Sequence, residues 1–286
     1  MSEKNKVEKS TLYLVATPIG NLADISERAV KVLTEADFIA AEDTRNSLRL
    51  LTALGIKNEL VSYHEHNKKA SGERLVERLL SGESCALITD AGMPAISDPG
   101  EDIVRLCADA GITVSVIPGA CAAVSALSVS ALATSRFAFE GFLSANKNER
   151  KKHLEKVKNE DRTLIFYEAP HKLRATLSDM ANSFGNERKI SLCREITKIN
   201  EEIKRLTLGE AVSFYELNEP RGEYVLVVEG CSSETISDEK KELLSLSPEE
   251  HVQRYEDEGL ARMDAIKRAA KDRGISKSEL YKILNS

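Results

Sequence analysis

The chain has 286 residues, of which 42% are hydrophobic and 30% are charged, and its formal net charge is −6. This composition is typical of a globular protein with a sizeable core, and the length predicts two domains. The negative charge argues against a protein that coats nucleic acid without specificity. No apolar run approaches the about 20 residues that cross a bilayer, so we expect no membrane partner.

The five cysteines lack the paired spacing of a metal site and stand mostly in apolar runs. Such cysteines are typical of core residues in a reducing cytosol, so we predict a cytoplasmic protein with no metal ligands and no disulfide frame. The first ten residues are polar and contain no apolar stretch of the signal-peptide kind. They are predicted to form a flexible tail.

Short apolar runs alternate with helical patterns through the first half of the chain. Five strand–helix units predict an N-terminal α/β domain over residues 11–134, with a largely parallel sheet and helices on both faces. Because the carboxyl ends of parallel strands meet at one edge, the polar or Gly/Pro clusters at Ile19, Asp43, His64, Asp90 and Pro118 are expected along that edge. The strands are predicted at residues 11–16, 38–41, 60–63, 86–88 and 113–117, and the helices at 25–36, 48–54, 73–80, 101–110 and 120–132.

The segment at residues 86–100 carries the clearest sign of a binding site. An apolar strand runs into a loop with two Gly, two Pro and two Asp, and a helix follows. A strand that feeds such a loop is the usual place for an α/β protein to hold a ligand. Asp90, at the end of the strand, can accept hydrogen bonds from hydroxyls or face a cationic group. The alternative is that the aspartates of this loop only cap the helix.

The second half of the chain predicts a C-terminal α/β domain with a mixed sheet over residues 135–231. Its last three strands are expected to follow one another with only short connections, and consecutive strands without crossover helices favour antiparallel pairing. The strands are predicted at residues 137–142, 163–167, 189–194, 202–208 and 224–229, and the helices at 147–158 and 172–184.

Residues 232–286 form a helical appendage in this interpretation, with helices at 239–246, 248–258, 260–273 and 276–284. The breaks at Gly259 and Gly274 resemble those of a helix-turn-helix. Between residues 262 and 282, seven Lys and Arg side chains stand against three Asp and Glu. The appendage is therefore either a nucleic-acid contact or a solvated helical tail.

The sequence lacks the motifs that are typical of several other classes of ligand and enzyme. The first strand is followed by PIGNL rather than by GxGxxG, and there is neither a Walker A sequence nor a serine nucleophile elbow. What remains is a site of acidic, Gly/Pro and small residues. Such a site suits a ligand with hydroxyls and a diffuse positive charge, and chemistry that depends mainly on positioning.

Three segments resemble the S-adenosyl-L-methionine (AdoMet) binding signatures of the tetrapyrrole methylase superfamily: TPIGNL at 17–22, DAGMP at 90–94 and PGACAA at 118–123. Four more, AEDTR at 41–45, HEHN at 64–67, SDPG at 97–100 and YEAPH at 167–171, narrow the resemblance to the branch that methylates ribose 2′-oxygens in bacterial small-subunit ribosomal RNA. The resemblance implies two α/β domains with AdoMet in the cleft between them, a target cytidine in free RNA or in an assembled subunit, and usually a homodimer.

The resemblance also implies which residues contact the cofactor. Carried over position by position, the contacts of the first domain are Ile19, Asp90, Met93, Cys121 and Ala122. Those of the second domain are Tyr167, Glu168, Glu223 and Tyr224.

Candidates for the general base are Asp43, His64 and Glu65, each at or near the carboxyl end of a strand. Residues predicted to contact RNA are Arg45, Asn67 and Arg194, together with the basic face of Lys147, Arg150 and Lys151. Each has a plainer alternative. Asp43 and Arg45 can be a local ion pair, His64 a polar rim residue, and the basic face an ordinary solvated helix.

Two other functions remain open from the sequence. One is an AdoMet-dependent methylase of a small molecule such as a tetrapyrrole precursor, and the other is a non-catalytic RNA-binding factor on the same fold. The polar AEDTR and HEHN clusters and the helical appendage favour RNA, because a macrocycle would require a larger apolar wall.

Overall fold

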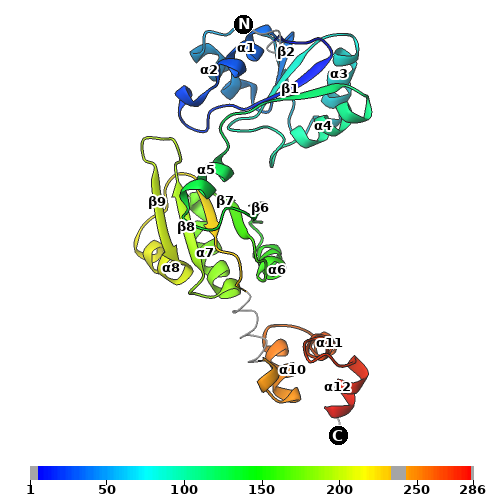
Figure 1. Ribbon diagram of the computed structural model, residues 1–286, viewed down its shortest axis with the longest axis vertical. Helices are drawn as coiled ribbons and strands as arrows, with labels where there is room; N and C mark the ends of the chain where they lie inside the picture. Colours follow the sequence, from blue (N-terminus) through cyan, green and yellow to red (C-terminus); the bar gives the residue numbers. More distant parts are fainter. Residues whose placement is uncertain (1–5, 233–242, 285–286) are drawn as a thin grey trace. The chain divides into compact units, whose positions relative to one another are not determined.

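The computed structural model describes residues 6–232 and 243–284 (Figure 1). The chain is divided into two compact units. The larger one is formed by residues 1–154 and 163–229, and the smaller one by residues 155–162 and 230–286. The first four residues of the predicted helix at 239–246 lie outside the described residues. The first half of the predicted tail, residues 1–5, also lies outside them. Within the described ranges, no helix is both long enough and apolar enough to cross a membrane.

The larger unit contains two sheets. The first has five strands, all parallel, in the order β3-β2-β4-β1-β5. Its strands are β1 (Thr11–Val15), β2 (Phe38–Ala41), β3 (Leu60–Ser62), β4 (Cys85–Ile88) and β5 (Thr113–Ile117). The helices between them are α1 (Glu27–Glu35), α2 (Thr44–Ala53), α3 (Lys68–Leu80) and α4 (Gly100–Asp109). The predicted parallel α/β sheet is confirmed.

Alternation along the strands gives this sheet a hydrophobic cluster on each face. Successive side chains of a strand point to opposite faces, so Tyr13 packs with α1 and α2, whereas its neighbour Leu12 packs with α3 and α4. Figure 1 shows the two helix pairs on opposite sides of the sheet. Because both faces are covered, only the edges of the sheet are left to carry polar sites.

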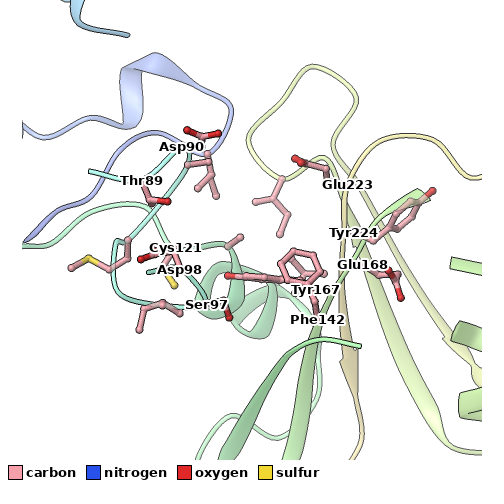
Figure 2. Close-up of a pocket in the computed structure, with 18 of the residues that line it drawn as sticks. Thr89, Asp90, Ser97, Asp98, Cys121, Phe142, Tyr167, Glu168, Glu223 and Tyr224 are labelled. Carbon is pink, nitrogen blue, oxygen red and sulfur yellow. The ribbon is translucent and has the colours of Figure 1, made fainter. Parts of the chain in front are cut away.

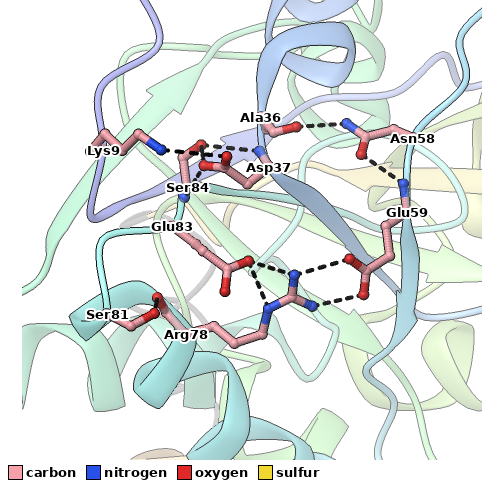
Figure 3. A network of polar contacts seen from close by, with 9 residues as sticks. All are labelled: Lys9, Ala36, Asp37, Asn58, Glu59, Arg78, Ser81, Glu83 and Ser84. Carbon is pink, nitrogen blue, oxygen red and sulfur yellow. Dashed lines mark hydrogen bonds and ion pairs between the residues drawn. The ribbon is translucent and has the colours of Figure 1, made fainter.

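A polar network closes the amino edge of the first sheet (Figure 3). The Arg78 guanidinium donates to both carboxylate oxygens of Glu59, at 2.8 and 3.0 Å, and its Nε donates to Glu83 at 3.0 Å. Beside it, Asp37 accepts hydrogen bonds from the backbone and the hydroxyl of Ser84, both at 2.7 Å. These contacts hold together the starts of β2, β3 and β4, and the carboxyl edge is left for a ligand.

The second sheet is mixed, as predicted, with the order β6-β7-β10-β8-β9. Strand β6 pairs parallel with β7, and the other pairs are antiparallel. Helix α5 (Ala122–Val129) packs on one face of this sheet, where Ala126 and Leu127 join Ile165 and Val225 in a hydrophobic cluster. The strands are β6 (Phe137–Phe142), β7 (Thr163–Glu168), β8 (Lys189–Arg194), β9 (Glu202–Thr207) and β10 (Tyr224–Val228), and helices α6 (Lys147–Val157) and α7 (Pro170–Phe184) precede β7 and β8.

One connection in the second sheet was predicted wrongly. Between β9 and β10 the chain forms helix α8 (Leu208–Leu217), which packs against α7, and β10 inserts between β7 and β8 instead of pairing with β9. Thr207 and Glu210 form a capping box at its start, and this T-x-x-E spacing was the available signal. The predicted antiparallel pairing holds for β8 with β9. Helices α2 and α3 also begin earlier than predicted, and Asp43 caps α2.

The smaller unit is helical among its described residues. Helices α10 (Pro248–Asp257), α11 (Arg262–Asp272) and α12 (Lys277–Ile283) follow one another closely. Val252, Tyr255, Ile266 and Leu280 are buried in a core of their own. The three helices lie where the sequence predicted them.

Candidate active site

A cavity of about 310 Å³ lies between two lobes of the larger unit. The first lobe is the β1–β5 sheet with α1–α4, and the second is the β6–β10 sheet with α5–α8. In Figure 2, Thr89 and Asp90 lie on one side of the cavity and Tyr167 and Glu223 on the other. The cavity therefore collects loops at the carboxyl edge of the first sheet and strand ends of the second.

All nine residues that the resemblance assigned to the cofactor line this cavity. From the loops after β1, β4 and β5 come Ile19, Asp90, Met93, Cys121 and Ala122. From strand β7 come Tyr167 and Glu168, and from the start of β10 and the residue before it come Tyr224 and Glu223. The structure thus brings together residues that are more than two hundred positions apart in the sequence, such as Ile19 and Tyr224.

Close backbone contacts build the wall of the first lobe. Thr17 and Gly92 form an isolated bridge, with N–O distances of 2.9 and 3.1 Å, which ties the loop after β1 to the loop after β4. Gly92 has a φ of +84°, and a Cβ there would lie 3.2 Å from Cγ2 of Ile19. Only glycine combines this backbone conformation with so close an approach, so Gly92 sets the width of the cavity at this point.

Asp98 holds the loop after β4 and lines the cavity, and one of its carboxylate oxygens is buried. Its Oδ1 accepts hydrogen bonds from the backbone of Ala95 at 2.9 Å and of Gly100 at 2.7 Å, which fixes a loop where Ala95 and Ser97 have positive φ. Oδ2 is buried and has no hydrogen-bond partner among the described residues. Because a buried carboxylate oxygen without a partner is costly, Oδ2 fits a ligand that brings a donor or a positive charge.

Asp90 is exposed at the mouth of the cavity. Its Oδ2 accepts a hydrogen bond of 3.2 Å from Nδ2 of Asn46, in the first turns of α2. The Asp90 side chain is thereby tied to helix α2, and Asp90 is one of the residues that line the cavity. The helix-cap alternative does not describe Asp90, whereas Asp98 does hold the start of α4.

Tyr167 supplies the aromatic wall of the second lobe. Its hydroxyl accepts a hydrogen bond of 3.2 Å from the backbone N–H of Ala123, and its ring contacts Phe142 edge-on, with 5.4 Å between centroids. Figure 2 shows the Tyr167 side chain reaching across the cavity toward Cys121. Burial raises the pKa of this hydroxyl to about 12, so it stays protonated at neutral pH.

Glu168 and Tyr224 line the cavity, but their polar groups are bound elsewhere. The buried Glu168 carboxylate accepts hydrogen bonds from Thr176, at 2.5 Å, and from the backbone of Ala169, at 2.9 Å. The Tyr224 hydroxyl lies 3.4 Å from that of Tyr215. These two residues can therefore offer a ligand their backbone and their apolar atoms, not their charged or hydroxyl groups.

A lysine from the β8–β9 loop closes the second-lobe side of the cavity. Nζ of Lys198 lies 2.8 Å from Oε1 of Glu195 and 2.8 Å from Oε2 of Glu223. The loop is tightly packed, since a Cβ on Gly20 would collide with the aliphatic part of Lys198. The sequence carries no local signal for Lys198, because its neighbours Gly20 and Glu223 are far from it in the chain.

The three predicted bases lie outside the cavity wall. Asp43 caps α2 and binds Arg45 through both oxygens, and these hydrogen bonds lower its pKa to about 2. Glu65 is exposed and pairs with Lys68 at 2.8 Å. His64 is half-buried beside His66, and its Nδ1 has no partner within the described residues. The local ion pair that the sequence left open for Asp43 and Arg45 is present.

Glu42, the residue before Asp43, does line the cavity. Its Oε2 accepts a hydrogen bond of 3.0 Å from Oγ1 of Thr89. Burial, and then the nearby charges of Asp90 and Asp98, raise the pKa of Glu42. Its place directly after β2, at the edge where ligands bind, was the signal that could have selected it.

The predicted RNA-contacting residues divide into exposed and occupied ones. Arg45, Lys147 and Lys151 are exposed, and the Arg45 guanidinium is also paired with Asp43 at 2.8 Å. The prediction for Arg150 is wrong, because its guanidinium is buried against Asp179, with Nη2 and Oδ2 2.7 Å apart. Asn67 uses its side-chain amide within its own loop, and Arg194 pairs with Glu202 at 3.5 Å.

No metal site is formed by the residues that the structure describes. No group of three or more His, Cys, Asp or Glu side chains in residues 6–232 and 243–284 is placed to hold an ion.

The chain is similar to known proteins over most of its length. Residues 11–212 match the model of the tetrapyrrole (corrin/porphyrin) methylases. Ribosomal RNA small subunit methyltransferase I of Halalkalibacterium halodurans is 50% identical over 282 residues, which cover 99% of this chain and 97% of that protein. The protein of the same name from Bacillus subtilis is 46% identical, with 98% and 96% covered.

A solved structure of the cobalamin biosynthetic enzyme cobalt precorrin-4 methyltransferase superposes with a TM-score of 0.57. It covers 77% of this chain and 95% of that chain at 15% identity, so this likeness concerns the fold alone. The family match and the two relatives are sufficient to establish the family of this chain. The chain belongs to the tetrapyrrole (corrin/porphyrin) methylase family and, within it, to the group of the ribosomal RNA small subunit methyltransferase I proteins.

Proposed function

We propose that this protein transfers a methyl group from AdoMet to the ribose 2′-oxygen of a cytidine in bacterial small-subunit ribosomal RNA. The chain is a methyltransferase, and AdoMet is the methyl donor of its family. The ribosomal substrate follows from the names of its relatives. The observation that carries the proposal is a cavity that unites the nine expected cofactor positions with Asp98, one of whose carboxylate oxygens has no hydrogen-bond partner among the described residues.

The residues of the cavity fit AdoMet. An adenosine with a sulfonium and an amino-acid end needs apolar walls, hydroxyl acceptors and acceptors for a cation. Ile19, Met93 and Tyr167 offer the walls, and Asp90 and Asp98 offer the acceptors. We propose that these five residues hold the cofactor.

When bound, AdoMet supplies an electrophilic methyl group on a positively charged sulfur. The residues of the chain would then contribute alignment, which by itself can provide much of the acceleration. A general base would add about 10²–10⁴-fold. From the sequence, Asp43, His64 and Glu65 stay proposals for that role.

We propose that RNA phosphates are held by exposed cations around the mouth of the cavity and beyond it. Arg45 stands beside Asp90, and Lys147 and Lys151 lie on the exposed side of α6. Phosphate contacts of this kind position the substrate and carry no sequence information. Helices α11 and α12, with their excess of Lys and Arg, are proposed as a second contact with the RNA.

The assembled small subunit or its free RNA is the proposed partner, and we propose a homodimer that works in the bacterial cytoplasm. A ribose in a splayed single strand is easier to reach than one in a duplex. The target is therefore expected in a loop or bulge of the RNA.

The test is methyl transfer to small subunits that lack the modification, with methyl-labelled AdoMet, followed by nuclease mapping of the label. Label on a ribose 2′-oxygen is expected with the native protein. Asp98→Asn keeps the size of the side chain and the acceptor for Ala95 and Gly100, and it is expected to lose AdoMet affinity by at least tenfold. Subunits and naked RNA that stay unlabelled while AdoMet binds would support a small-molecule methylase instead.

A further inference from the structure

We infer that Glu42 is the proton acceptor of the methyl transfer and that Thr89 is its positioning residue. The inference rests on the proposed function, and it names a catalytic group that differs from the three bases predicted from sequence. It is carried by the position of Glu42 in the cavity wall, by the contacts of its two oxygens, and by the charges that face it.

The sheet register places Glu42 and Thr89 side by side. Ala41, the last residue of β2, is paired with Ile88, the last residue of β4. Glu42 and Thr89 follow these two residues directly, and both line the cavity. Two adjacent parallel strands thus deliver a carboxylate and a hydroxyl to the same point of the carboxyl edge.

The two oxygens of Glu42 have different roles. Oε2 accepts the 3.0 Å hydrogen bond from the Thr89 hydroxyl, which anchors the carboxylate. Oε1 accepts no hydrogen bond from any residue that the structure describes. One oxygen is therefore held in place while the other is available to a hydroxyl that enters the cavity.

The surroundings of Glu42 suit a base. The groups that face it are the Thr89 hydroxyl and Asp90 from the end of β4, Asp98 from the loop before α4, and His64 from the end of β3. Burial and the two aspartates raise its pKa, while the Thr89 hydrogen bond and His64 oppose that shift. A carboxylate with a raised pKa is a stronger base than an exposed one, and it transfers protons more effectively near neutral pH.

Its neighbour Asp43 lies in the opposite situation. Asp43 accepts hydrogen bonds from the Arg45 side chain at 3.1 and 2.8 Å and from the Arg45 backbone at 2.8 Å. Both of its oxygens are occupied, and its pKa is lowered to about 2. Two consecutive carboxylates are thus held at different basicities, and only Glu42 lines the cavity.

The step is a single displacement. The ribose 2′-oxygen forms a bond to the methyl carbon as the carbon–sulfur bond breaks, and that electron pair remains on sulfur as a thioether. The 2′-hydroxyl proton passes to Oε1 of Glu42, which becomes a neutral carboxylic acid and returns the proton to water after the product leaves. No oxidant, reductant or metal ion enters this balance.

The test is Glu42→Gln, which keeps an acceptor for Thr89 and removes the base. Single-turnover methyl transfer to unmodified small subunits is expected to slow by about 10²–10⁴-fold at neutral pH. AdoMet affinity by calorimetry and subunit affinity by filter binding are expected within about twofold of the native values. Glu35→Gln, the same substitution on the exposed side of α1, serves as the control and is expected to keep the native rate.

The pH profile separates a base from a structural residue. The native rate is expected to rise with pH while Glu42 loses its proton and then to level off, and this rise is expected to be absent in Glu42→Gln. Thr89→Val removes a hydrogen bond that lowers the pKa of Glu42, so its rise is expected at higher pH, and Thr89→Ser is expected to restore the native profile.

Two results would overturn the role of Glu42, and a third would overturn the proposed function on which it rests. A Glu42→Gln protein that keeps more than a tenth of the native rate with an unchanged pH profile would overturn the role of Glu42 and leave the proposed function intact. Loss of AdoMet affinity in Glu42→Gln equal to its loss of rate would also overturn it. Native protein that binds AdoMet but labels neither subunits nor RNA would overturn the proposed function itself.

Discussion

The hydroxyl of Tyr167 accepts a hydrogen bond of 3.2 Å from the backbone N–H of Ala123. Tyr167 belongs to β7, and Ala123 lies in the first turn of α5, where helix N–H groups have no partner within the helix. Cys121 and Ala122, just before it, form part of the cavity wall. A side chain of the second sheet therefore fixes the segment that enters from β5 of the first sheet.

Tyr167→Phe is expected to weaken AdoMet binding by about fivefold and to lower the free energy of unfolding by about 1 kcal/mol, because one partly buried hydrogen bond is lost. Calorimetry and urea denaturation measure the two effects. Tyr13→Phe removes a comparable 2.7 Å bond with the backbone of Glu8, outside the cavity, and is expected to leave AdoMet affinity unchanged. Equal losses of affinity in both variants would show that the Tyr167 hydroxyl has no particular role at the site.

Arg150→Met is expected to lower the free energy of unfolding by about 3–5 kcal/mol, because it leaves the buried Asp179 carboxylate without its partner. Lys151→Met, on the exposed side of the same helix, is expected to change it by less than about 0.5 kcal/mol. Denaturant unfolding of the two variants compares them directly. Similar stability in both, with RNA affinity lost in Arg150→Met, would return Arg150 to the RNA-contacting face.

The double variant Lys147→Ala/Lys151→Ala tests the RNA contact of α6. Each lost phosphate contact is expected to reduce the slope of log Kd against log salt by about 1, hence by about 2 in total. Filter binding at salt concentrations between about 50 and 200 mM gives the slope of log Kd against log salt. Lys57→Ala, an exposed lysine before β3, is the control. A double variant with the native slope would leave the exposed side of α6 as an ordinary solvated surface.

The helical unit is expected to lose stability in acid through His251. This side chain is fully buried, its Nδ1 accepts a 3.0 Å hydrogen bond from Arg273, and its Nε2 has no hydrogen-bond partner in the described part of the chain. Burial, and then the Arg273 charge, lower the pKa of His251 below its ordinary value, although Asp272 opposes the shift. The unfolded state therefore binds the proton more readily than the folded state.

The stability that neutral His251 contributes is fully present above the pKa of histidine in the unfolded state, about 6.5. It is lost as the pH falls through the lower pKa of His251 in the folded state. Amide exchange of α10–α12 in the full chain is expected to be faster at acidic than at neutral pH, after correction for the intrinsic rate. In His251→Gln this difference is expected to shrink. If α10–α12 of the native protein were equally protected from amide exchange at acidic and neutral pH, the role of His251 in acid stability would be contradicted.

Local patterns in the sequence determined much of this protein. Short apolar runs and period-3.6 hydrophobic spacing predicted the strands of both sheets and most helices, because burial inside a covered sheet or along a helix stripe leaves a trace in neighbouring residues. The Gly/Pro/Asp loop after β4 marked the cavity for a similar reason, since tight turns and close approaches need particular residue types. The resemblance then supplied nine positions that all line one cavity.

The tertiary structure decided what each polar side chain does. Arg150 looked like one more cation of a basic helix, and only its distance from Asp179, 29 residues later, shows that it is buried. Glu42 and Asp43 are equivalent in the sequence, yet one meets Thr89 across the sheet and the other binds Arg45 beside it. The physical reason is that burial and charge act through contacts between residues distant along the chain, whereas hydrophobic periodicity is local.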